Sequence, residues 1–152
     1  MKELLAFALW LTFYRESDCA LRYVEAVAAV TQDRAEGRVL VLLAKHENFL
    51  HCGSHEAPFG LSDWRVAHRR LPSIEEAAPI ALRGVRSLLR RCGTVDAALG
   101  HWHHGTQAPR HGCWSDWLST WEASSLAAWR WSDEGGANPT RVPLGMPARR
   151  AP

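Results

Sequence analysis

Glu47 is the residue whose surroundings in the sequence most strongly suggest chemistry. It shares one helical stripe with Leu40, Leu43 and Leu50, in a segment that is apolar almost all round. An unpaired carboxylate is costly to bury, so these surroundings favour the protonated form. A protonated carboxyl group can act as a general acid and donate a proton to a leaving oxygen. A glutamate near a helix end can also reach water or pair with an arginine, and periodicity alone favours that structural role.

The histidines, 8 in number, also raise the question of a metal site. His46, Glu47 and His51 resemble the H-E-x-x-H motif of zinc proteases, but the second histidine comes five positions after the first, not four. On a helix the two rings would then lie on different faces and could not share one zinc ion. A second set could gather a metal at the end of its helix: His101, His103, His104 and, further on, His111. Loop histidines without a ligand are commoner, so we expect no metal and no cofactor.

Glu47 also stands in the first of three sequence blocks spread over residues 39–105. The blocks are Leu42-Leu43-Ala44-Lys45-His46-Glu47-Asn48-Phe49, Phe59-Gly60-Leu61-Ser62-Asp63, and the segment 84–93 followed by 97–105. In order and spacing they resemble the catalytic core of the soluble lytic transglycosylases and goose-type lysozymes. That family has an apolar helix ending in Glu-Ser-x-Phe, a Gly-Leu-Met-Gln loop, and a Gly-x-x-Tyr-Leu helix followed by Ala-Leu-Ala-x-Tyr-Asn-x-Gly.

The resemblance implies a mainly α, lysozyme-like single domain whose central buried helix carries the catalytic glutamate, Glu47. It implies cleavage of the β-1,4 bond between N-acetylmuramic acid and N-acetylglucosamine in peptidoglycan. In the scheme with one carboxylate, Glu47 protonates the glycosidic oxygen and then takes a proton from the 6-hydroxyl of the muramic acid, which leaves an anhydro sugar. The residues expected to bind substrate and shape the cleft are Asn48, Phe59, Gly60, Leu61, Trp102 and His103.

The sequence departs from the family pattern at several of these positions. Asn48 replaces Ser but can still form hydrogen bonds, whereas Trp102 and His103 replace Tyr-Asn and lose a phenol hydroxyl while keeping an aromatic platform. Asp63 replaces Gln, and at roughly 6.5–9.5 Å from Glu47 it would activate a water and make the enzyme an inverting hydrolase. Asp63 could equally cap a helix or stabilise a loop. The departures favour one alternative, a catalytically inactive domain that binds glycan or builds a secretion or virion assembly.

The elements that must position these residues are predicted to be helices, because apolar residues recur at helical spacing along most of the chain. No stretch alternates apolar and polar residues for long enough to predict a sheet. The predicted helices are one from Leu4, one capped by Asp18, one from Val39 to about Leu50, a short one with a Ser73/Glu76 capping box, one opened by Pro79 and ended by Gly93, one started by Thr94, and one capped by Ser115. A polar loop separates the third and fourth over residues 51–71. We expect the domain over residues 1–132 and a disordered tail over 133–152.

Length and charge agree with one soluble domain. The chain has 152 residues, a hydrophobic content of 47% and a formal net charge of only +2. Arginines at helical spacing, Arg83, Arg86, Arg90 and Arg91, could face an anionic polymer, but a solvated helix face is the simpler interpretation. A DNA-associated regulator ranks last, because the sequence has no helix-turn-helix pattern. The expected partner is therefore the peptidoglycan glycan strand, bound by a monomer, with no nucleic acid.

The cysteines and the apolar start of the chain bear on its location. No C-x-x-C pair occurs among the four cysteines, which are Cys19, Cys52, Cys92 and Cys113. Their spacing is about equally compatible with two disulfides and with buried free thiols. The segment Leu4 to Phe13 is too short to span a membrane and lacks the positive leader of a signal peptide, so we expect a core helix and no stable membrane insertion. The family implies the periplasm, the cell wall or a virion as the setting, while the export route stays open.

Overall fold

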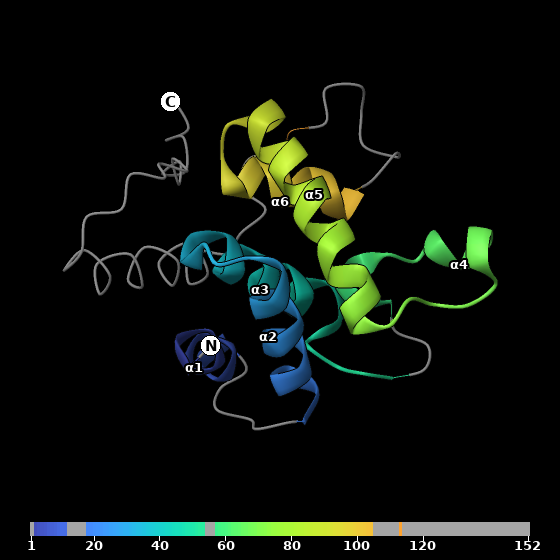
Figure 1. The fold of residues 1–152 in the computed structure, drawn as a ribbon. Coiled ribbons are helices and arrows are strands. Elements are labelled where there is room, and N and C mark those ends of the chain that lie inside the picture. Colours follow the sequence, from blue (N-terminus) through green and yellow to red (C-terminus); the bar gives the residue numbers. More distant parts are fainter. Residues whose placement is uncertain (1, 12–17, 54–56, 105–112, 114–152) are drawn as a thin grey trace. The chain divides into compact units, whose positions relative to one another are not determined.

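The structure, a computed structural model, describes residues 2–11, 18–53, 57–104 and 113. These residues form helices and no strand, which confirms the predicted mainly α fold (Figure 1). The chain divides into two compact units, residues 1–84 and 85–152, and the division falls inside one helix, α5 (Ile74–Cys92). The predicted helix capped by Ser115, the boundary at 132 and the tail lie outside the described residues.

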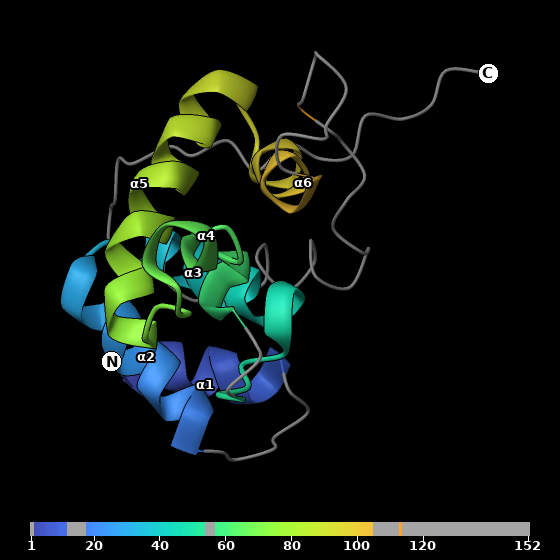
Figure 2. The same ribbon diagram turned by 90° about the vertical axis from the view of Figure 1, so that its right-hand side faces the viewer.

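Three helices of the first unit pack on one another: α1 (Lys2–Leu11), α2 (Asp18–Val30) and α3 (Arg34–Asn48). They lie side by side in both ribbon views (Figures 1 and 2). The centre of this packing is α3, in which every residue from 37 to 44 is buried. At Gly37 an added Cβ would lie 3.0 Å from a methyl group of Leu4, so the absence of a side chain there lets α1 approach α3 closely.

The ends of α3 differ from the predicted Val39 to about Leu50. The helix begins earlier, at Arg34, because the carboxylate of Asp33 accepts a hydrogen bond from the backbone N–H of Glu36 at 3.0 Å. It ends at Asn48, because the next residue, Phe49, has a left-handed φ of 56° and closes the helix with a hydrogen bond to the carbonyl of Lys45. The first turn of α3, which begins at Arg34, is polar and has no apolar periodicity, so the sequence pattern did not show that the helix starts there.

The segment predicted as a polar loop, residues 51–71, contains two short helices. A 3₁₀ turn, η1, spans Pro58–Gly60 and packs on α3, and a one-turn helix, α4, spans Trp64–His68. No residue of α4 is buried, and α4 stands away from α1, α2 and α3 within its unit (Figure 1). The rings of Trp64 and His68 stack on each other at 3.8 Å, which supports this single turn from inside the helix.

The predicted capping box before α5 is confirmed, but the break at Pro79 is not. Glu76 accepts a hydrogen bond from the N–H of Ser73 at 2.8 Å, and Ser73 Oγ accepts one from the N–H of Glu76 at 3.1 Å. One helix then runs through Pro79 to Cys92, where two helices were predicted. A continuous apolar face holds it together at the cost of one backbone hydrogen bond: Ile74, Ala77, Ala78, Ala81, Leu82 and Val85.

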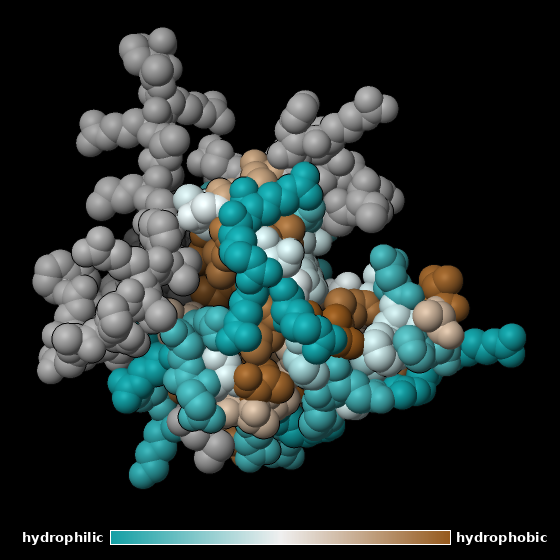
Figure 3. All heavy atoms as spheres, turned by 45° about the horizontal axis from the view of Figure 1, so that its top comes forward, coloured by the Kyte–Doolittle hydropathy of each residue, from teal (hydrophilic) through white to brown (hydrophobic). Residues whose placement is uncertain are grey.

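In the second unit, α5 is followed by α6 (Val95–His104) after a turn that the sequence predicted. Gly93 has a φ of 78° and donates its N–H to the carbonyl of Leu89 at 2.9 Å, and Thr94 Oγ1 accepts from the N–H of Ala97 at 3.2 Å. None of the described helices has the length and apolar character needed to cross a membrane. On the face shown in Figure 3, most of the described side chains are hydrophilic, with smaller hydrophobic areas between them.

The structure pairs all four cysteines, which decides between the two alternatives that the sequence left open. Cys19 is bonded to Cys52, with 5.6 Å between their Cα atoms, and Cys92 to Cys113, with 5.4 Å. The first disulfide ties the start of α2 to the segment that follows α3. The second ties the end of α5 to the segment beyond α6.

Candidate functional site around Glu47

Glu47 lies at the end of α3, where the buried helix reaches the surface of its unit. Residues 39–44 are buried, whereas Lys45, His46 and Glu47 are each half-buried. The carboxyl group is therefore less enclosed than its apolar stripe predicted.

Gly60, the last residue of η1, lies directly against the side chain of Glu47. A Cβ built on Gly60 would stand 3.0 Å from Cγ of Glu47 and 2.8 Å from the carboxyl carbon Cδ, and still closer to Oε2. Real Cβ atoms essentially never approach a neighbour that closely, and the φ of Gly60, 73°, is itself unfavourable for any residue with a side chain. Two of the three sequence blocks therefore meet at the carboxyl group of Glu47.

Phe59 holds the η1 turn in place from inside the unit. Its side chain has no exposed surface, and its ring packs edge-on against Tyr23 with 5.3 Å between ring centroids. Its φ of 54° lies in the left-handed region, which a bulky residue seldom adopts unless its surroundings fix it. This differs from the expected contact of Phe59 with substrate, because a fully buried ring can only support the site.

Asn48 is also buried, with 6% of its surface exposed, and bonds inside the protein. Its Nδ2 group donates to the hydroxyl of Tyr23, and that hydroxyl donates to the backbone carbonyl of His51 at 3.3 Å. The same Nδ2 group lies 3.4 Å from this carbonyl. Asn48 therefore anchors the chain just after α3 and does not present its amide to a substrate, again unlike the expectation.

Tyr23 is the residue of this network that the sequence interpretation missed. It lies on α2 beside Val24 and Val27, and all three are fully buried. The signal was present, because a tyrosine on an apolar helical stripe must bring a hydrogen-bond partner for its hydroxyl group. The disulfide between Cys19 and Cys52 closes the same region, since Cys52 directly follows the carbonyl that Tyr23 and Asn48 share.

Leu61 and Asp63 follow the η1 turn and are more accessible. Leu61 is half-buried, and Asp63 is exposed in the position before α4. Asp63 makes no capping hydrogen bond with its side chain, and only its backbone carbonyl accepts, from the N–H of Val66 at 3.1 Å. The carboxylate of Asp63 thus does not cap α4, which was one of the two structural alternatives for this residue, the other being the stabilisation of a loop.

Trp102 and His103 lie on α6, in the second unit. Trp102 is half-buried and His103 is exposed, so each offers some surface to a ligand. Ala98 and Leu99 are buried and lie four and three positions before Trp102, so Trp102 continues the buried side of α6 towards the surface.

A pocket of about 410 Å³ in the first unit is lined by other residues than Glu47: Arg22, Cys52, Gly53, Pro58, Arg70, Leu71, Pro72, Ser73 and Ile74. Both of its arginines are paired, Arg22 with Glu75 at 2.9 Å and Arg70 with Glu76 at 2.6 Å. The hydrogen bonds from Arg70 lower the pKa of the Glu76 carboxyl group to about 2. The pKa of Glu75 is also lowered, chiefly by a hydrogen bond from its own backbone N–H and then by Arg22. Because both guanidinium groups are neutralised, this pocket is a weaker candidate for an anion than its arginines suggest.

No model of a known protein family, no curated protein and no solved structure matches the chain.

Proposed function

We propose that this protein cleaves the β-1,4 bond between N-acetylmuramic acid and N-acetylglucosamine in peptidoglycan, with Glu47 as the general acid. The observation that carries the proposal is the close approach of Gly60 to the Glu47 side chain. This contact supports the sequence resemblance, because the resemblance implies that Gly60 of the second block shapes the cleft in which Glu47 of the first block acts. The half-buried position of Glu47 against a backbone turn supports this role, because a proton donor needs a defined position beside the bond that breaks.

In the proposed reaction, the protonated Glu47 donates its proton to the glycosidic oxygen as the bond to the muramic acid breaks. The carboxylate then takes the proton of the 6-hydroxyl group of the same sugar, and that oxygen attacks C1 to form an anhydro ring. Glu47 returns to its protonated form, so no other carboxylate is needed. If Asp63 instead activates a water molecule, the product carries a reducing end, and the enzyme is a hydrolase.

Substrate and setting belong to the same proposal. The substrate is the glycan strand of the cell wall, and the place of action is the periplasm, the cell wall or a virion. The two disulfides support such a setting, because disulfides persist in oxidising compartments and are rare in the cytosol. For contact with the sugars we propose the half-buried Trp102 and the exposed His103, which the sequence resemblance assigns to this role.

The experiment is digestion of purified peptidoglycan by the wild type and by Glu47→Gln, with the released fragments identified by mass spectrometry. We expect the variant to be at least about 100-fold slower, because a general acid contributes 10²–10⁴-fold to such a reaction. Glu25→Gln is the matched control, since Glu25 is exposed on α2 and undergoes the same substitution away from Glu47. It should digest at the wild-type rate.

The chemistry of the fragments separates the two mechanisms. Anhydromuropeptides from the wild type alone would support a lytic transglycosylase in which Glu47 is the single carboxylate. Reducing ends that disappear in Asp63→Asn would support hydrolysis. Fragments released by neither protein, with both shown to be folded and to bind the glycan, would contradict catalysis and favour a glycan-binding or structural domain.

A further inference from the structure

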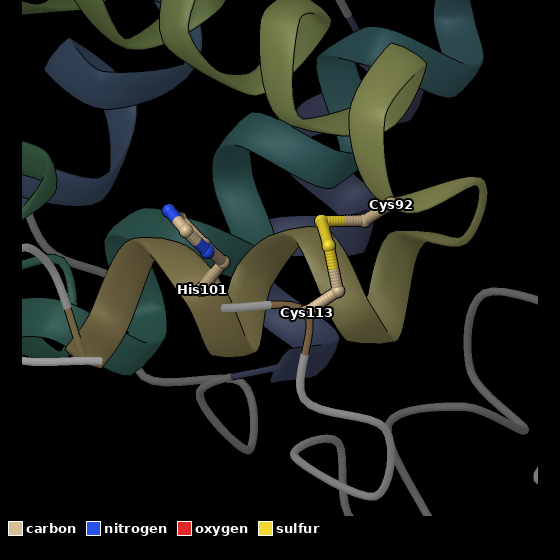
Figure 4. Close-up of side chains that lie close together, drawn as sticks. All are labelled: Cys92, His101 and Cys113. Atoms are coloured by element: carbon tan, nitrogen blue, oxygen red, sulfur yellow. A yellow bond between two sulfur atoms is a disulfide. The ribbon is translucent and has the colours of Figure 1, made fainter. Parts of the chain in front are cut away.

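The ring of His101 lies beside the disulfide between Cys92 and Cys113 (Figure 4). One ring nitrogen and the two sulfur atoms all lie within 4.8 Å of one another. Each of the three residues is half-buried, so the cluster is partly shielded from water and still accessible to small molecules.

Two of the three side chains are held by the backbone and not by the disulfide. Cys92 is the last residue of α5, and His101 lies on α6. The turn between them is fixed by the left-handed Gly93 and by the capping hydrogen bond of Thr94. Breaking the disulfide would therefore free Cys113 while Cys92 and His101 keep their relative positions.

We propose that reduction of this disulfide turns the cluster into a zinc site with Cys92, Cys113 and His101 as ligands. A dithiol reductant supplies two electrons and two protons, becomes a disulfide itself, and leaves Cys92 and Cys113 as thiols. Zn²⁺ then displaces the two thiol protons and binds both thiolates and the neutral ring nitrogen of His101. Oxidation of the thiolates by a disulfide of the glutathione type releases the metal and restores the bond between the cysteines.

The geometry of the cluster suits this ion. Zinc is bound by cysteine sulfur at about 2.3 Å and by histidine nitrogen at about 2.0–2.1 Å, so tetrahedral ligand atoms lie roughly 3.5–3.8 Å apart. The three ligand atoms, already within 4.8 Å, need only small side-chain rotations to reach these separations once the sulfurs are no longer bonded. Two thiolates and one imidazole select zinc over the harder cations, and a water molecule can take the fourth position.

The cluster differs from the histidine group that the sequence suggested. His103 is two positions from His101 on the same helix and so points to nearly the opposite side. In the described residues the structure groups His101 with two cysteines instead. The sequence pattern did not show this, because Cys113 is distant in the chain and carries no spacing signal with Cys92.

The test is metal binding by the full chain before and after reduction with a phosphine, with far-ultraviolet circular dichroism to show that the helices persist. We expect one Zn²⁺ or Co²⁺ per reduced chain, a thiolate-to-cobalt charge-transfer band, and no such binding by the oxidised protein. A second measurement locates the site: zinc should protect Cys92 and Cys113 from iodoacetamide while Cys19 and Cys52 are alkylated, as read by peptide mass spectrometry.

Variants complete the test. His101→Ala should weaken zinc binding at least about 10–100-fold, the loss typical of even an outer-shell partner, while His103→Ala should leave it unchanged. The absence of a stoichiometric metal in the reduced, helical protein would overturn the proposal. So would equal protection of all four cysteines, or zinc binding of wild-type strength in His101→Ala. None of these results depends on glycan cleavage.

Discussion

Replacing Gly60 with alanine tests whether the η1 turn positions Glu47 for its proposed role. The added Cβ has two separate effects. It places a side chain at a φ of 73°, in the left-handed region, and it brings a methyl group to 2.8 Å from the carboxyl carbon of Glu47. The first effect acts on the stability of the fold, and the second acts on the position of the carboxyl group.

The two effects have different magnitudes. A left-handed backbone costs an alanine about 1–2 kcal/mol, which for a chain of this length lowers the melting temperature by about 2–8 °C. The contact can be relieved only if Glu47 moves, because ordinary contact begins at 3.4 Å and the carboxyl carbon must therefore shift by at least about 0.6 Å. Since a misplacement of about 1 Å costs an enzyme about 100-fold in rate, we expect a loss of activity of that order.

Gly93→Ala is the matched control. Gly93 has a similar φ of 78°, but a Cβ built there meets no atom within 4 Å. The two variants should therefore lose about the same stability, measured by thermal unfolding, while only Gly60→Ala should lose the release of soluble fragments from peptidoglycan. If folded Gly60→Ala digests peptidoglycan as fast as Gly93→Ala, then the contact does not position a catalytic group, and the reasoning from Gly60 to Glu47 is refuted.

Three further predictions concern the fold that carries the site. Leu40→Ala, at a fully buried position of α3, should lower the free energy of unfolding by about 2–5 kcal/mol in a denaturant titration. Tyr23→Phe removes the hydroxyl that accepts from the buried amide of Asn48 and should cost about 1–3 kcal/mol in the same assay. Glu76→Gln removes a carboxylate whose pKa is lowered from 4.5 to about 2 by Arg70, so its stabilising effect is present above about pH 4.5 and is lost as the pH falls to about 2. The melting temperatures of wild type and Glu76→Gln should therefore differ at pH 7 and converge near pH 2.

Val66→Ala is the control for Leu40→Ala, because the Val66 side chain is 86% exposed and its loss should change the free energy of unfolding by less than about 0.5 kcal/mol. If Leu40→Ala lowers the free energy of unfolding no more than Val66→Ala does, α3 is not the centre of the packing. An unchanged stability of Tyr23→Phe would show that water replaces the lost hydroxyl. A difference between wild type and Glu76→Gln that persists at pH 2 would come from something other than the charge.

The sequence predicted those helix caps that depend only on residues a few positions apart in the chain. The capping box of Ser73 and Glu76, the left-handed Gly93 and the Thr94 cap each depend on neighbours in the chain, and the structure confirms all three. The new helix predicted to begin at Pro79 was wrong, because packing of the apolar face of α5 prevailed over the local effect of the proline. The apolar face of α5 continues on both sides of the proline and outweighs one missing hydrogen bond.

Contacts between distant segments could not be predicted from the sequence. The hydroxyl of Tyr23 meets Asn48 and the carbonyl of His51 only because α2 packs on α3, and periodicity shows the buried face of each helix but not the register between them. The same holds for the partners of the four cysteines. Asn48 and Phe59 illustrate the consequence, since a sequence motif indicated that they matter but not that they act from inside the protein.

Gly60 and Gly93 have similar backbone conformations but different surroundings. At Gly93 the backbone alone requires a glycine, because the space around its Cα is open, and such a residue indicates only a turn. At Gly60 the backbone also favours a glycine, and a Cβ built there would in addition stand 2.8 Å from the carboxyl carbon of Glu47, so the Glu47 side chain would have to shift to make room for it. The η1 turn at Gly60 therefore lies directly against the side chain of the half-buried Glu47. A proton donor needs a defined position, and we propose that the contact with the η1 turn gives Glu47 that position.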